Sequence, residues 1–152
     1  MAQFARPDED FTNGLNGVGN YTDQGGGTTD IYTTIDEVGA SDADFIRSPT
    51  SPVNEVYVCR LSDVTDPVLS TGHIMRMRTS TDLDAQEVLD FTQTLRQGYA
   101  TEASQGTLIA SQSRNTVSST TWTTSSYTLS GAEADAITDY TALFYRFIIN
   151  KP

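Results

Sequence analysis

The chain has 152 residues, with 20 acidic side chains against 9 basic ones and a net charge of −11 at pH 7. A chain of this length is typical of one domain, and its negative field repels nucleic acid and anionic membrane surfaces. No apolar run approaches the roughly 20 residues of a membrane-spanning helix. From the charge and from this absence together, we expect neither nucleic acid nor a membrane among its partners.

Residues 1–28 differ in composition from the rest of the chain. Six of the eleven glycines lie there among few large apolar residues, so the segment cannot bury enough surface to fold alone. We expect an extended, Gly-rich N-terminal arm over 1–28 and a β-sandwich domain over 29–152. A free, flexible arm is one alternative. The other is an arm that orders on a partner, with Phe4, Phe11 and Tyr21 as its anchors.

Alternation of apolar and polar residues predicts antiparallel strands along the remaining chain. The runs are 29–35, 55–61, 72–78, 88–97, 107–113, 120–129 and 141–149. Many short strands separated by turn residues are typical of all-β sandwiches and barrels, and we expect an antiparallel sandwich of jelly-roll type. The shared apolar faces of two runs predict its core, which comprises Leu89, Phe91, Leu95, Leu143, Tyr145 and Phe147.

One short segment, Ser130 to Asp139, has a helical pattern instead. Ser130 is a good N-cap residue and Glu133 follows three positions later, which is the capping-box signature. One or two helical turns are too short to form a layer of their own. We therefore interpret this helix as a connector that carries the chain from one sheet to the other before the last strand.

Few residues have a pattern that indicates chemistry. Cys59 and His73 are the only cysteine and the only histidine, which argues against a disulfide or a transition-metal centre. His73 lies in a strand-like run, and no serine is marked as its nucleophilic partner, so we interpret it as structural. We expect no catalytic residue, no metal and no cofactor, and we interpret the chain as a binding or structural module rather than an enzyme.

Two local features leave alternatives open. The loop at 36–44 collects Asp36, Glu37, Asp42 and Asp44, whose oxygens suit Ca²⁺, but their spacing is not that of an EF-hand. We favour a solvated turn over a calcium site there. Trp122 lies in a Ser/Thr-rich run, where we favour a core residue over a side chain that stacks on a sugar ring.

Several segments resemble small β-sandwich, jelly-roll-like modules of tailed-bacteriophage virion structural proteins. The resemblance runs through nearly the whole chain, and its most specific segments are IYTTIDEVGASDADFIRS and TLSGAEADAITDYTALFYRF. It implies a virion structural protein without catalytic residues. The acidic composition favours a position outside the DNA-filled shell.

The resemblance leads us to expect a capsid decoration or cement protein that binds the outer surface of the head. A neck, collar or tail component is an alternative, and so is a carbohydrate-binding module of the host-recognition apparatus. The expected partners are other virion proteins, such as the major capsid protein, together with copies of the chain itself in a homo-oligomer, a trimer in our expectation. The expected location is the virion, after synthesis in the host cytoplasm.

Overall fold

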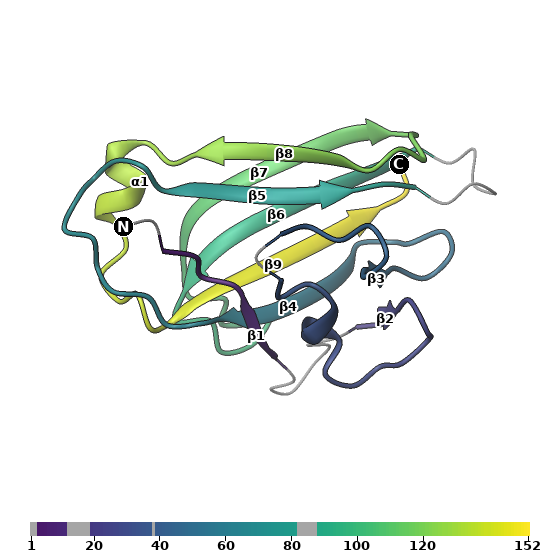
Figure 1. The fold of residues 1–152 in the computed structure, drawn as a ribbon, viewed down its shortest axis with the longest axis horizontal. Coiled ribbons are helices and arrows are strands. Elements are labelled where there is room, and N and C mark those ends of the chain that lie inside the picture. Colours follow the sequence, from purple (N-terminus) through teal and green to yellow (C-terminus); the bar gives the residue numbers. More distant parts are fainter. Residues whose placement is uncertain (1–2, 12–18, 38, 82–87) are drawn as a thin grey trace.

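The computed structural model describes residues 3–11, 19–37, 39–81 and 88–152, and the arrangement reported below is that of these residues. They form mostly antiparallel β-structure with one short α-helix (Figure 1), which confirms the all-β class. No helix within these ranges is long and apolar enough to cross a membrane.

The largest sheet, called the main sheet below, has five strands whose neighbours are all antiparallel. In spatial order they are β1 (Pro7–Asp10), β4 (Glu55–Leu61), β9 (Leu143–Asn150), β6 (Leu89–Gln97) and β7 (Thr107–Val117). The last strand of the chain is therefore the central strand of this sheet. Strands β4, β6 and β9 lie where the alternating pattern predicts strands.

A two-stranded sheet, the ribbon, covers one face of the main sheet. It pairs β5 (Ile74–Thr79) with β8 (Thr123–Thr128), and the two strands run side by side in Figure 1. Met75 and Met77 of β5 are only 1% and 5% exposed and pack against apolar side chains of the main sheet. The ribbon is therefore packed against the main sheet through apolar side chains.

The jelly-roll topology is not confirmed. A jelly roll distributes eight strands over two sheets, whereas the second layer over the described main sheet is a ribbon of two strands. The other small sheet pairs β2 (Thr22–Asp23) with β3 (Ile46–Arg47). Both of its strands lie in segments without an alternating apolar pattern.

The predicted core residues occupy the interface between the layers to different degrees. Leu89, Phe91, Leu95 and Leu143 are buried. Tyr145 and Phe147 are only partly buried, and both pack against the same hydrophobic core. The face assignment of β6 and β9 from sequence is therefore correct.

The predicted strand over 29–35 is wrong. Ile31–Thr34 forms a 3₁₀ helix, η1, whose first turn is held by a carboxylate from a distant strand. Asp10 of β1 accepts hydrogen bonds from the backbone N–H groups of Ile31 (2.7 Å) and Tyr32 (3.0 Å). Its third donor is the hydroxyl of Tyr57 in β4, at 2.8 Å. Alternation alone cannot reveal this non-local cap.

The described residues of the predicted arm, 3–11 and 19–28, lie against the β-domain. β1 extends the main sheet by pairing with β4, and the side chain of Tyr21 is 1% exposed within the core. The segment thus contacts its own chain through backbone pairing and through one large buried aromatic ring.

The helix α1 (Gly131–Asp135) is shorter than predicted, but it is capped as predicted. The Ser130 hydroxyl accepts from the Glu133 N–H, and the Glu133 carboxylate accepts from the Ser130 N–H. α1 follows β8 of the ribbon and precedes β9 of the main sheet, so it connects the two layers.

The Asp10 cap gives a stability prediction. Asp10→Ala leaves two buried donors and one partly buried donor without an acceptor, so we expect the free energy of unfolding to fall by roughly 3 kcal/mol or more. Tyr57→Phe removes one of these bonds together with its donor and should cost about 1 kcal/mol. Urea denaturation measures both changes. Glu9→Ala, at an exposed position of the same strand, is the control and should stay within about 0.5 kcal/mol of wild type. Equal stability of the Asp10 and Glu9 variants would contradict this account.

Candidate functional site

Two of the three most exposed large apolar side chains of the described residues lie at the tip of the loop between β4 and β5. Val68 is 86% exposed and Leu69 is 65% exposed. We call these two adjacent residues the apolar knob. Single exposed aliphatic residues are ordinary on protein surfaces, but two adjacent ones at a loop tip form a compact apolar projection.

The backbone of the knob is strained. Val68 has a φ of 56°, in the left-handed region that β-branched residues rarely adopt. It follows Pro67, and its N–H donates to the Asp66 carboxylate at 2.7 Å. In tight turns, a position with positive φ is ordinarily Gly or Asn. A valine held there, with its side chain in solvent, contributes nothing to the core and marks a position of functional interest.

Neighbouring elements hold the loop that bears the knob. The side chain of Gln3 forms two hydrogen bonds with the backbone of Thr65, at 2.9 and 2.8 Å. On the other side, the Ser70 hydroxyl donates to the carboxylate of Asp135 at the end of α1. The loop, α1 and the N-terminal segment therefore lie together at one end of the molecule (Figure 1). The knob is anchored on both sides.

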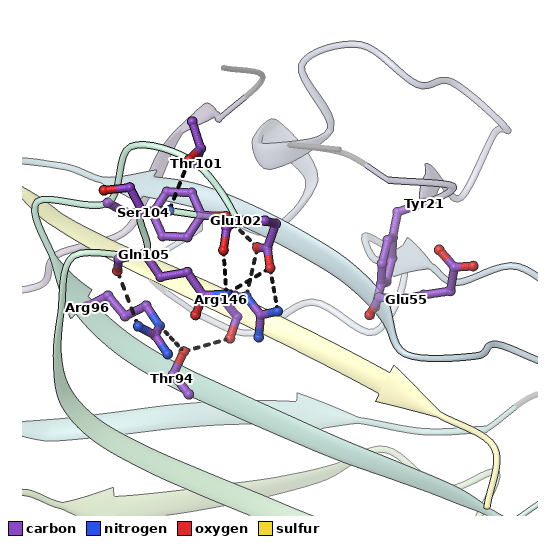
Figure 2. Close-up of polar contacts among 10 residues, drawn as sticks. Tyr21, Glu55, Thr94, Arg96, Thr101, Glu102, Ser104, Gln105 and Arg146 are labelled. Carbon is purple, nitrogen blue, oxygen red and sulfur yellow. Dashed lines mark hydrogen bonds and ion pairs between the residues drawn. The ribbon is translucent and has the colours of Figure 1, made fainter. Parts of the chain in front are cut away.

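The three predicted anchor residues have different surroundings. Phe4, next to Gln3, is 51% exposed and lies at the knob end of the molecule. Phe11 is half-buried, with its ring centroid 5.0 Å from that of Phe144. Tyr21 is buried, and its hydroxyl donates to the backbone carbonyl of Glu55 at 3.2 Å (Figure 2). Of the three, Phe4 alone presents a large apolar surface to solvent.

The face of the main sheet opposite the ribbon carries a network of charged side chains (Figure 2). Glu102, in the loop between β6 and β7, accepts two hydrogen bonds from Arg146 of β9, at 2.8 and 2.7 Å. It also accepts from the Tyr99 hydroxyl and, at 3.0 Å, from Gln105. The hydrogen bonds from Arg146 are the main cause that lowers the pKa of Glu102. The sequence pattern did not predict this network.

Arg96 of β6 completes the network. Its guanidinium donates to the Thr94 hydroxyl and to the Gln105 carbonyl, both at 3.2 Å. Partial burial, followed by the positive charge of Arg146, lowers the pKa of Arg96. Both carboxylate oxygens of Glu102 accept hydrogen bonds from neighbouring side chains. We therefore interpret the network as structural: it holds the 99–106 loop against the sheet.

A cavity of about 750 Å³ lies between the main sheet and the ribbon. Apolar side chains such as Met75 and Leu95 line it, together with the amide of Gln93. Trp122 also lies on its wall, half-buried, with its ring centroid 5.6 Å from that of Phe45. The prediction of Trp122 as a residue of the inter-sheet core is therefore wrong, because the residue precedes β8 and lies beside the loop that carries Phe45.

Asp42 of the acidic loop and His73, the only histidine, each interact with one side chain from another part of the chain. Asp42 forms a bidentate ion pair with Arg78 of β5, at 2.6 and 2.8 Å, and the hydrogen bonds from Arg78 lower the pKa of Asp42. His73 Nε2 lies 2.8 Å from the Tyr140 hydroxyl. Within the described ranges, no group of three or more His, Cys, Asp or Glu side chains is arranged to hold a metal ion. Both carboxylate oxygens of Asp42 are bonded to Arg78.

No protein-family model matches this chain, and comparisons with curated proteins and with solved structures found no match either. The resemblance to phage virion modules therefore stays an expectation from the quoted segments. A role for the protein has to be inferred from its own surface.

The Glu102–Arg146 pair predicts a pH dependence. Because the folded state lowers the pKa of Glu102 below its ordinary value of 4.5, its contribution to stability is fully present above that value. The contribution is lost as the pH falls through the lowered pKa. The difference in unfolding free energy between wild type and Glu102→Gln should therefore be constant near neutral pH and shrink below about pH 4.5.

Chemical denaturation at a series of pH values measures this difference. Glu37→Gln, an exposed position of the acidic loop, controls for the loss of one negative charge from the protein. A Glu102→Gln difference that stays the same into acidic solution would show that the carboxylate is not stabilised by Arg146.

Proposed function

We propose that this protein is a structural component of a tailed-bacteriophage virion, a capsid decoration or cement protein that binds the outer surface of the head. The observation that carries the proposal is the apolar knob of Val68 and Leu69, a projection that is unsuited to a free surface and suited to a contact with another protein. The resemblance of the quoted segments to virion modules supplies the class of partner.

The physical properties of the knob suit attachment. Burying a Val or Leu side chain contributes about 1.5–3 kcal/mol, so two such residues supply a substantial gross free energy to a contact. The bonds of the loop to Gln3 and Asp135 fix its conformation before binding, which reduces the entropy lost on association. Phe4, next to Gln3 in the chain, is a further exposed apolar side chain.

The net charge agrees with a place outside the shell. A module of charge −11 is repelled by packaged DNA and has no electrostatic reason to lie inside the head. The partner on this proposal is the major capsid protein. Attachment to a neck, collar or tail protein is the alternative location within the same class.

Variants of the knob test the proposal. Val68→Asn combined with Leu69→Ser removes the apolar surface, and Asn tolerates positive φ far better than Val. We therefore expect the melting temperature to stay the same or rise, while binding to virions weakens at least about tenfold, since 1.4 kcal/mol corresponds to a factor of ten. The measurement is occupancy on purified particles of the phage that encodes the chain, compared with wild-type protein.

Val53→Asn is the matched control. Val53 is 73% exposed but lies beside the C-terminal end of β9, where Pro52 accepts from Lys151, away from the knob. This variant should occupy particles like wild type. Equal occupancy by the knob variant would rule out the knob as the attachment surface, and absence of the wild-type chain from purified particles would rule out the virion role.

A carbohydrate-binding module is a second candidate, favoured by the position of Trp122. It lies half-buried beside Phe45 on the wall of the cavity, where an aromatic face and nearby hydroxyls can meet a sugar ring. Trp122 is the chain's only tryptophan, so its fluorescence reports binding directly. This candidate predicts a saturable fluorescence change on titration with neutral oligosaccharides, and loss of binding in Trp122→Ala. A flat titration across a panel of hexose oligosaccharides would eliminate it.

A further inference from the structure

The main sheet has two edges, and the two are built differently. The β1 edge is four residues long, begins with Pro7, carries Asp8 and Glu9, and has a register shift between Pro7 and Glu9 in its pairing with β4. Short length, proline, charge and irregular pairing are the features by which natural proteins protect a sheet edge from pairing with another chain. The β1 edge is therefore protected against pairing with a strand of another chain, and we call it the guarded edge.

The β7 edge differs from it in length and composition, although its pairing with β6 also has register shifts, between Leu89 and Phe91 and between Leu95 and Arg96. β7 is eleven residues long, the longest strand of the described chain, and contains neither proline nor an acidic residue. It pairs with β6 on one side only and is the last strand in the order of the sheet. Among the described residues, no backbone hydrogen bond reaches its outer edge. Its free N–H and C=O groups form a template for another strand.

The charge distribution also singles out this edge. The segment 103–132, which contains β7 and β8, has no Asp or Glu, although an even distribution of 20 acids over 152 residues would place about four there. Arg114 is its only charged residue. On β7 itself, Ser111, Ser113 and Asn115 are exposed, and so is half of the Leu108 side chain. The β7 strand thus carries no acidic side chain and one basic one on a strongly acidic protein.

We propose that β7 pairs with β7 of a second copy of this chain, antiparallel about a two-fold axis, and joins the two main sheets into one continuous sheet. Two copies of charge −11 repel each other wherever acids face acids. At physiological ionic strength, charges farther apart than about 8 Å are largely screened, so a contact free of acids is what association requires. The β7 strand itself carries no acid and supplies the backbone groups for pairing.

The second copy is the occupant that this geometry favours. Antiparallel pairing of one strand with its own copy is isologous, so every group on the edge meets its counterpart and the assembly closes at two copies. A trimer, as expected from the sequence, needs a head-to-tail contact, and the guarded β1 edge does not offer one to β7. The inference is independent of the virion role, because it concerns contacts between copies only.

Sedimentation velocity over protein concentrations from about 1 µM to about 1 mM measures the association of the full chain. We expect a monomer–dimer equilibrium for wild type. Ser111→Glu with Ser113→Glu places two acids on each copy of the paired strand, and like charges across paired strands are destabilising, so the dissociation constant should rise about tenfold or more. Ser126→Glu with Thr128→Glu on β8 introduces the same charges at exposed positions of the ribbon and should leave dimerisation unchanged.

Hydrogen exchange of the wild-type protein provides a test that needs no variant. Amides within 107–117 should exchange more slowly at concentrations above the dimer transition than below it, while amides of β1 should not change. A wild-type chain that is monomeric throughout, a trimer, or a dimer with no concentration-dependent protection in 107–117 would each overturn the proposal. So would a folded Ser111→Glu, Ser113→Glu variant that dimerises like wild type.

Discussion

The rest of the structure depends on the insertion of the last strand, β9, into the centre of the main sheet. β4 and β6 do not pair with each other, and each pairs with β9 along nearly its whole length. Without β9, the sheet would separate into the β1–β4 pair and the β6–β7 hairpin. The sheet therefore closes only when the C-terminal residues are in place, and such non-local pairing is intrinsically slow to form.

Both faces of β9 are covered, and this explains much of what surrounds it. On one face, Leu143 packs into the core beneath the ribbon, while on the other Phe144 packs against Phe11 and Tyr99. Next along the same outward face, Arg146 meets Glu102, which holds the 99–106 loop on the sheet. The described N-terminal segment and this loop thus act as partial covers for a strand that has apolar residues on both sides.

The central position of β9 also determines where contacts with other molecules can form. Its N-terminal end follows α1, so the connector helix and the strained β4–β5 loop lie together there and present Val68 and Leu69 to solvent. Its flanks are filled by β4 and β6, which leaves β1 and β7 as the two edges of the sheet. β7 contacts α1, which also holds the loop of the apolar knob, so the two surfaces lie on neighbouring elements.

The sequence by itself determined the all-β class, the strands β4, β6 and β9, the buried faces of β6 and β9, and the capping box at Ser130 and Glu133. These features follow from local patterns, namely alternation along a strand and the spacing of a cap, which act over a few residues. The sequence also singled out Phe4, which is exposed at the same end as the knob. It did not single out Val68, because no pattern distinguishes a strained, exposed valine from an ordinary loop residue.

Tertiary structure alone decided the features that depend on distant partners. The run from Thr29 to Ile35 alternates like a strand. It forms η1 instead, because the Asp10 carboxylate accepts hydrogen bonds from the backbone N–H groups of Ile31 and Tyr32. The predicted arm has little apolar surface of its own. Tyr21 is nevertheless part of the hydrophobic core, because its ring packs beside that of Tyr57 in β4. The edge status of β7 likewise depends on the spatial order of the strands. Pairing partners far apart in sequence are selected by the packing of the whole domain, and local periodicity carries no information about them.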